Sequence, residues 1–203
     1  MLILGHTGIT LGAALVMSGV VSSTHPHTAD DTASVNTRRS LLNRPAAWLS
    51  RLADKIDLRF LLIGALLPDI IDKPLGHIFL REELSSGRTI AHSLLFLVVI
   101  ALAGWLVYRL QHRNWLLVVS AGSLAHLVLD QIWLMPQTLF WPFMSATFQK
   151  HDLSNYVANT FSSLATNPAT YIPEIIGGLI LLWFGWEILK RHQLVPFIKY
   201  GKL

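Results

Sequence analysis

The chain has 203 residues, of which 52% are apolar and only 14% are charged, and it contains no cysteine. Soluble domains carry about 25% charged residues, and a chain this small exposes too much surface to cover it with so few charges. The composition therefore excludes a disordered or fibrous protein and argues against an ordinary soluble domain. The lack of cysteine excludes disulfides, thiolate metal sites and cysteine nucleophiles.

Five apolar segments follow one another along the chain, each near the roughly 20 residues that cross the hydrocarbon core of a bilayer. They are residues 2–21, 58–80, 89–110, 115–135 and 171–189. A chain of this length cannot shield five apolar helices from water. We therefore predict one all-α membrane domain over residues 1–203, a polytopic helix bundle with about five transmembrane or re-entrant helices. The first segment lacks the basic start and cleavage site of a signal peptide, so we expect a retained helix.

Residues 22–57 form the long polar connection between the first two apolar segments. Within residues 41–56, apolar side chains recur near helical spacing, with Arg44, Arg51 and Lys55 between them. This pattern predicts an amphipathic helix that lies at the membrane interface. A helix packed on the bundle explains the pattern equally well.

The positions of the 16 Lys and Arg residues indicate an orientation. The connections between the apolar segments alternate, so that 12 basic residues lie in one set and three in the other, with Lys73 inside the second segment. The positive-inside rule then puts the N-terminus outside, and residues 22–57 and the C-terminus in the cytoplasm. Topology and contact with anionic lipid headgroups account for the net charge of +4, so we expect no nucleic-acid partner.

Ionisable side chains inside the apolar segments are costly to bury, so each one marks a candidate functional site. Six such residues are His6, Asp69, Asp72, His92, His126 and Asp130. His126 and Asp130 are four residues apart, which places an imidazole and a carboxylate on one helix face where both can reach a metal ion. A His–Asp hydrogen bond that ties helices together is the alternative.

Asp69 and Asp72 follow Pro68, which removes a backbone donor and disturbs the helix. Broken helices within a membrane line polar cavities, although two aspartates that cap the next helix would show the same pattern. His6 and His92, taken singly, are typical of structural histidines.

In the predicted orientation, all six residues lie toward the outer end of their segments. Imidazole and carboxylate ligands at one depth suit Zn, Mn or Fe, and zinc is the first choice.

Several short motifs occur in a characteristic order. They are Gly5-His6-Thr7-x-x-Thr10, Gly64-Ala65-Leu66-Leu67-Pro68-Asp69, Arg88-x-x-x-His92-Ser93, Gly122-Ser123-x-x-His126-x-x-x-Asp130 and Phe140-Trp141-Pro142. Over about residues 1–145, this set resembles the bacterial inner-membrane metal-dependent hydrolase family, one branch of which is labelled LexA-binding or LexA-regulated. It is more distantly similar to zinc-dependent phospholipase C and related single-strand nucleases.

The resemblance implies an inner-membrane location and a metal site with a defined ligand set. The implied ligands are His6, Asp69, His92, His126 and Asp130, with Asp130 bridging two ions. The distant relatives bind a further ion through a His-x-x-x-Glu motif that this sequence lacks. His151 and Glu174 are possible substitutes with open roles, so we expect one or two ions.

The leading functional hypothesis is metal-dependent hydrolysis of a phosphoester in a lipid or lipid-linked substrate. Asp69 or Asp72 would accept a proton from water, and Arg88 would hold a phosphate oxygen or, alternatively, contact lipid headgroups. Two hypotheses from other classes stay open: a non-enzymatic membrane regulator, and a small ion or proton transporter, since His/Asp relays also mark such pathways.

Overall fold

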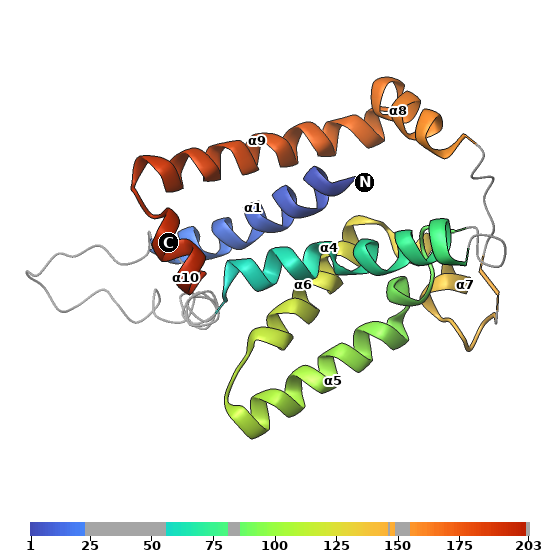
Figure 1. Cartoon of the computed structure of the whole chain (residues 1–203), viewed down its shortest axis with the longest axis horizontal. Coiled ribbons are helices and arrows are strands. Elements are labelled where there is room, and N and C mark those ends of the chain that lie inside the picture. Colours follow the sequence, from blue (N-terminus) through green and yellow to red (C-terminus); the bar gives the residue numbers. More distant parts are fainter. Residues whose placement is uncertain (23–55, 81–85, 146, 149–154, 202–203) are drawn as a thin grey trace, which may run out of the picture.

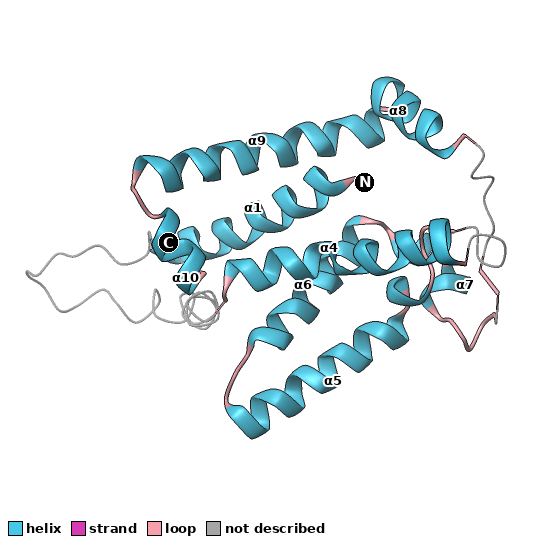
Figure 2. Cartoon of the chain, in the orientation of Figure 1, coloured by secondary structure: helices cyan, strands magenta, loops and turns pink. Residues whose placement is uncertain are grey.

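The computed structural model describes residues 1–22, 56–80, 86–145, 147–148 and 155–201, and among these residues there are helices and loops but no strand (Figure 2). The longer helices are α1 (Ile3–Ser22), α4 (Leu58–Pro74), α5 (Leu94–Gln111), α6 (Trp115–Leu129) and α9 (Pro168–Lys190). The prediction of an all-α protein is therefore confirmed for the described residues. The expected interfacial helix within 41–56 falls almost wholly outside them.

Shorter helical elements complete the two ends of the molecule. They are η1 (Leu75–Phe79, π-helical), η2 (Ile90–His92) and η3 (Ile132–Leu134), both 3₁₀, and the α-helices α7 (Pro136–Leu139), α8 (Tyr156–Thr166) and α10 (Leu194–Tyr200). The predicted apolar segments 58–80, 89–110 and 115–135 each contain one long helix and one such short element. These segments are therefore less regular than a continuous transmembrane helix.

The long helices pair in a fixed order (Figure 1). α1 packs against α9, α4 packs against α6, and α5 covers the other side of α6. α4 also contacts α1, so it joins the α1–α9 pair to the α6–α5 pair. This arrangement places the first half of α1 beside the middle of α4 and the end of α6.

Two helices, α5 and α9, are long and apolar enough to cross a membrane, with 18 and 23 residues. Only 6% of the apolar window in α5 and 22% of that in α9 is buried. Helices that are apolar and mostly exposed need an apolar surrounding. α6 and the Ile3–Met17 part of α1 are apolar but shorter. Length and composition therefore support two of the five expected spans.

Glycines allow the paired helices to approach closely. A Cβ on Gly8 of α1 would collide with the backbone of Gly177 on α9, and a Cβ on Gly64 of α4 would collide with the backbone of Val119 on α6. Small residues serve this purpose in membrane helix pairs, where van der Waals packing replaces the hydrophobic driving force. These contacts determine how closely α1 approaches α9 and how closely α4 approaches α6.

The interior divides into two regions of opposite character. The apolar cluster consists of Leu11, Phe184 and Ile188, with Leu15, Leu58, Leu62, Leu181 and Phe197 packed against it. The polar cluster consists of His6, Asp69, Asp72, His92, His126 and Asp130, whose side chains are nearly or completely buried. α1 contributes to both, because His6 precedes Leu11 by little more than one helical turn.

Candidate metal centre

A proline in α4 leaves a backbone carbonyl group free for a hydrogen bond from α6. Pro68 has no N–H group, so the carbonyl of Gly64 lacks its helical partner. The hydroxyl of Ser123 on α6 donates to that carbonyl at 3.1 Å. One turn further along α6, Nδ1 of His126 donates to the carbonyl oxygen of Ala65 at 2.7 Å. Because a carbonyl can only accept, the proton of neutral His126 is on Nδ1, and Nε2 carries a lone pair.

His92 is held in the same manner from the other side. Its Nδ1 lies 2.7 Å from Oδ2 of Asp72, which is completely buried. The Asp72 carboxylate also accepts the backbone N–H groups of Thr89, Ala91 and His92 at 2.6 to 3.2 Å. Asp72 thereby fixes the orientation of the His92 ring and leaves Nε2 as the free nitrogen. A carboxylate behind a histidine ligand is a common feature of metal sites.

The two free nitrogens point at each other. Nε2 of His92 and Nε2 of His126 are 3.2 Å apart, and Oδ1 of Asp69 lies 3.7 and 3.8 Å from them. When both rings are neutral with protonated Nδ1, two lone pairs face one another beside a carboxylate. A bound cation relieves this repulsion, and His and Asp are ligands that zinc accepts. The donor set therefore fits a divalent metal.

A second group of potential ligands shares His126. His6, His126 and Asp130 offer donor atoms that all lie within 4.8 Å of one another, as do those of Asp69, His92 and His126. Nε2 of His6 is 3.1 Å from Oδ1 of Asp130, yet neither ring nitrogen of this buried histidine has a partner in hydrogen-bonding geometry. The His6 ring stacks on His126, with centroids 3.9 Å apart. Buried polar atoms without partners are rare and indicate a missing ligand or ion.

The structure thus brings together the five metal ligands implied by the sequence: His6, Asp69, His92, His126 and Asp130. Asp130 lies between the two groups, because its Oδ1 faces His6 while its Oδ2 lies 3.7 Å from Nε2 of His92 and 4.0 Å from Nε2 of His126. The sequence predicts Asp72 as a second candidate base beside Asp69. In the structure Asp72 lies behind His92, where its carboxylate orients the imidazole ring.

A pocket of about 360 Å³ opens next to these ligands, with Asp69 and Asp130 in its wall. Two cationic side chains also line it: Nζ of Lys73 is 2.5 Å from Oδ2 of Asp69, and Nε of Arg88 is 2.7 Å from Oδ2 of Asp130. The sequence predicts Arg88 at the site but does not single out Lys73. The sequence signal for Lys73 is its position four residues after Asp69, since residues at this spacing share a helix face.

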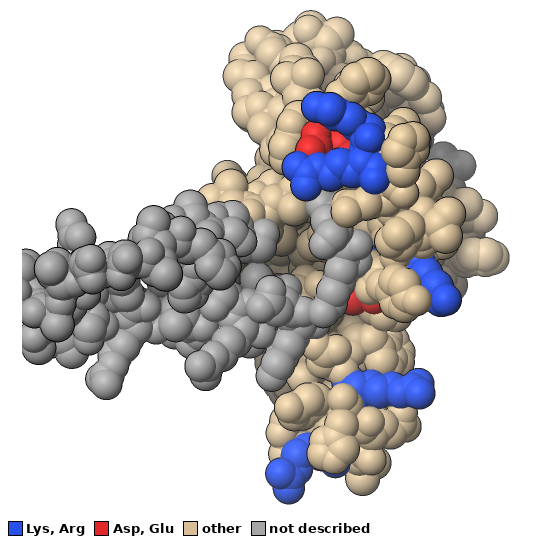
Figure 3. Space-filling view, turned by 90° about the vertical axis from the view of Figure 1, so that its left-hand side faces the viewer, with Lys and Arg blue, Asp and Glu red and all other residues tan. Residues whose placement is uncertain are grey.

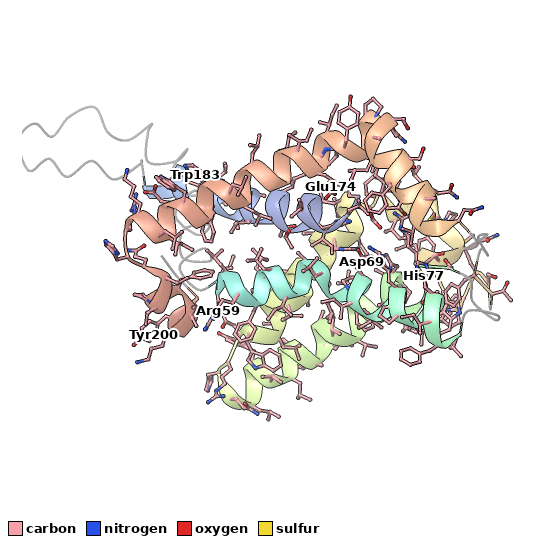
Figure 4. The ribbon with its side chains drawn as sticks, turned by 45° about the horizontal axis from the view of Figure 1, so that its top comes forward. Arg59, Asp69, His77, Glu174, Trp183 and Tyr200 are labelled. Carbon is pink, nitrogen blue, oxygen red and sulfur yellow. The ribbon has the colours of Figure 1, made fainter. Side chains whose placement is uncertain are left out.

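Glu174 lies on α9 in the same half of the molecule as Asp69 (Figure 4), but it has another partner. Its carboxylate accepts the backbone N–H groups of Leu2, Leu4 and Gly5 at 2.5 to 3.1 Å. The first N–H groups of a helix lack partners and carry a partial positive charge, which a carboxylate stabilises. Glu174 therefore caps α1 and belongs to neither of the two metal-ligand groups. His151, the other suggested substitute ligand, lies outside the described residues.

Long apolar helices together with a buried set of histidines and aspartates define a helical membrane protein with a candidate metal centre. The chain belongs to the YdjM inner membrane protein family, whose model matches residues 1–194. No curated protein and no solved structure matches the chain. The family description places the protein in the bacterial inner membrane and names no activity or cofactor.

Proposed function

We propose that this protein is a membrane-embedded, metal-dependent hydrolase that cleaves a phosphoester bond in a lipid or lipid-linked substrate. One observation carries the proposal: two ligand groups that share His126 each place a carboxylate, Asp69 or Asp130, in the wall of a pocket that Lys73 and Arg88 also line. Metal ligands beside cationic side chains are the combination that phosphoester chemistry requires, because charge develops on phosphoryl oxygens.

The residues present fit one or two divalent ions, with zinc as the first choice and Mn or Fe as alternatives. His92, His126 and Asp69 would hold one ion, while His6 and Asp130 would serve a second. A single imidazole nitrogen binds one ion, so His126 belongs to one of them at a time. A divalent cation bound here supplies Lewis acidity toward water and toward phosphoryl oxygens.

The chain's own side chains supply binding and proton transfer. Arg88 lines the pocket while its Nε contacts Asp130, so its guanidinium is positioned to bind a phosphate oxygen. Lys73 offers a second cation in the lining of the same pocket. Asp69 is the candidate base, because it reaches the pocket and its Oδ1 faces the histidines. These roles are compatible with a substrate whose phosphate enters from the pocket side.

We further propose five membrane-spanning or re-entrant segments, with the N-terminus outside. Figure 3 looks onto the end of the molecule where α9 ends and α10 lies, and Lys and Arg side chains spread over that end. Arg59, Arg109, Lys190 and Lys199 all lie in terminal turns of their helices. The positive-inside rule assigns this end to the cytoplasm. The pocket, at the other end of α4, then lies near the outer face at headgroup depth.

A matched pair of variants tests the proposal. His126→Asn removes the shared ligand, whereas His112→Asn changes an exposed histidine that adopts a left-handed conformation, which asparagine tolerates. Purified wild type and His112→Asn should bind zinc or manganese stoichiometrically and release phosphate or headgroup from membrane phospholipids. His126→Asn should lose metal binding by more than about 100-fold, beyond the usual effect of residues behind the ligands.

The rival functions predict other results. A wild-type protein that stays free of metal under metal-replete conditions would exclude the hydrolase. A non-enzymatic regulator would hydrolyse no phospholipid, whether or not it bound metal. A transporter would move ions into liposomes after the metal had been removed.

A further inference from the structure

The charges around the pocket favour one class of lipid headgroup. Lys73 and Arg88 pair with Asp69 and Asp130, so these four side chains together carry no net charge, and the Met1 ammonium group, which also lines the pocket 3.3 Å from Oδ1 of Asp130, adds a positive charge. The divalent cation of the proposed function, on which this inference rests, makes the pocket more positive. A positive pocket attracts phosphate and repels an ammonium group such as that of choline or ethanolamine.

The side chains around the pocket also disfavour quaternary ammonium ligands. Such ligands are held by aromatic rings that present their negative faces. Of the described residues that line this pocket, none is Phe, Tyr or Trp. Neutral polar side chains are prominent instead: Ser86, Asn159, Thr160, Ser163 and Thr170. Hydroxyl and amide groups recognise a ligand that itself carries hydroxyl groups.

The orientation of α8 explains how it presents polar groups to the pocket. At 100° per residue, Asn159 and Ser163 share one face of this helix, and Val157 and Phe161 share the opposite face. Asn159 and Ser163 line the pocket, whereas Val157 and Phe161 are 66% and 68% exposed. An apolar outer face favours contact with lipid. A lipid contact on that face would leave the polar face of α8 turned toward the pocket.

We propose that the pocket binds the phosphate ester of a neutral polyol, such as glycerol or a sugar, and that Asn159 and Ser163 recognise its hydroxyl groups. In this arrangement Lys73 and Arg88 contact the phosphate, and α8 contacts the polyol. The residues of α8 thereby determine which headgroup is accepted, while the metal ligands are the same for every phosphoester.

Three short-chain lipids with identical dihexanoyl chains separate charge from hydroxyl recognition. Phosphatidylglycerol carries a negative charge and hydroxyl groups, phosphatidylmethanol carries only the charge, and phosphatidylcholine carries an ammonium group. Their affinity for zinc-loaded protein in neutral detergent is measured by calorimetry, and glycerol phosphate alone tests whether the acyl chains are needed. Phosphatidylglycerol should bind about tenfold more tightly than phosphatidylmethanol, as expected for one or two hydrogen bonds, and phosphatidylcholine should bind most weakly.

Two neighbouring serines provide the control. Ser163→Ala should weaken binding of phosphatidylglycerol but not of phosphatidylmethanol, and combining it with Asn159→Ala should bring the two lipids within about threefold. Ser162→Ala, at an exposed position outside the pocket, should keep the full preference. Equal affinity of wild type for all three lipids, or a preference that survives the double substitution, overturns the proposal.

Turnover distinguishes this inference from the proposed function. Selective binding of phosphatidylglycerol without hydrolysis would support the polyol pocket and refute the hydrolase. Equal hydrolysis of phosphatidylglycerol and phosphatidylcholine would support the hydrolase and refute the polyol pocket.

Discussion

The two buried regions of this protein share α1 and α4 and are built by opposite means. In the apolar cluster, Leu11 of α1 packs against Phe184 and Ile188 of α9, and dispersion contacts supply the stabilisation. In the polar cluster, His6 of α1 has no hydrogen-bond partner and stacks on another histidine. The apolar cluster and the glycine contacts hold the helices together, so that the polar cluster can keep donor atoms free for a ligand.

The end of the molecule beside the apolar cluster is closed by the C-terminal helix, where Figure 4 shows Arg59 near Tyr200. The N–H of Leu58 donates to the carbonyl of Gly201 at 2.9 Å, and the Arg59 guanidinium donates to the carbonyl of Ile198. Gly201 has φ of +68°, and a Cβ there would collide with the Asp57 carboxylate. The carbonyl groups of Ile198 and Gly201 therefore have hydrogen-bond partners within the chain at this end. The other end of the molecule instead has the pocket.

The largest effect is expected from Gly177→Leu, because this substitution disturbs the apolar cluster and the polar cluster together. The new side chain collides with the backbone of Leu4 and Gly5 and separates α1 from α9. We expect a loss of about 3 kcal/mol in the free energy of unfolding, together with loss of metal binding. Unfolding in mixed detergent micelles, followed by tryptophan fluorescence, measures the first effect. Gly185→Leu is the control, since a Cβ there has nothing within 4 Å.

The next effect concerns the polar cluster alone. Asp72→Asn weakens the contact that orients His92, and zinc affinity should fall by about 10- to 100-fold. Competition with a chelator measures this affinity. Asp57→Asn, at the opposite end of α4, should leave the zinc affinity unchanged. Wild-type affinity in Asp72→Asn would show that His92 is not a ligand or needs no support.

A smaller effect is expected from a substitution in the apolar cluster, which tests whether this cluster and the metal site are independent. Phe184→Ala leaves a cavity beside Leu11, but the unfolded reference state is already surrounded by lipid, so only the packing contribution is lost. We expect a decrease of about 2 kcal/mol in the free energy of unfolding with unchanged metal stoichiometry. Trp183→Ala, at a 57% exposed neighbour, should change stability far less. Loss of metal from Phe184→Ala would show that the two regions are coupled.

The smallest effect is electrostatic and depends on pH. Partial burial opposes ionisation of Asp57, but hydrogen bonds from the side chain and backbone of Arg59 outweigh it, so the pKa of Asp57 lies below its usual range. Asp57 therefore stabilises the fold above its unfolded pKa of about 4, and this stabilisation disappears as the pH falls through the lower folded pKa. Asp57→Asn should be less stable than wild type by under about 1 kcal/mol at pH 7. A difference that fails to shrink toward pH 3 would contradict this account.

Much of the candidate site could be predicted because ionisable residues contrast with an apolar background. His6, Asp69, Asp72, His92, His126 and Asp130 all stand out as ionisable residues in apolar segments, the spacing pairs His126 with Asp130, and the family resemblance implies that all of them except Asp72 are ligands. The spacing of four residues between Asp69 and Lys73 is a local signal in the sequence, whereas the role of Glu174 could not be predicted. Lys73 contributes a cation to the pocket, and Glu174 caps a helix that begins 171 positions earlier in the chain. No local pattern contains a contact of that separation.

The sequence alone determined the helical class, the membrane setting and the residue types at the site. Composition and periodicity depend on each residue's own preference for lipid or water, which is a local property. Only the tertiary structure decided that Asp72 stands behind His92, that two imidazole nitrogens face each other at 3.2 Å, and that α8 turns Asn159 and Ser163 toward the pocket. These relations depend on how closely the helices pack and at what rotation, and packing distance and rotation belong to the whole bundle and to no single segment of the sequence.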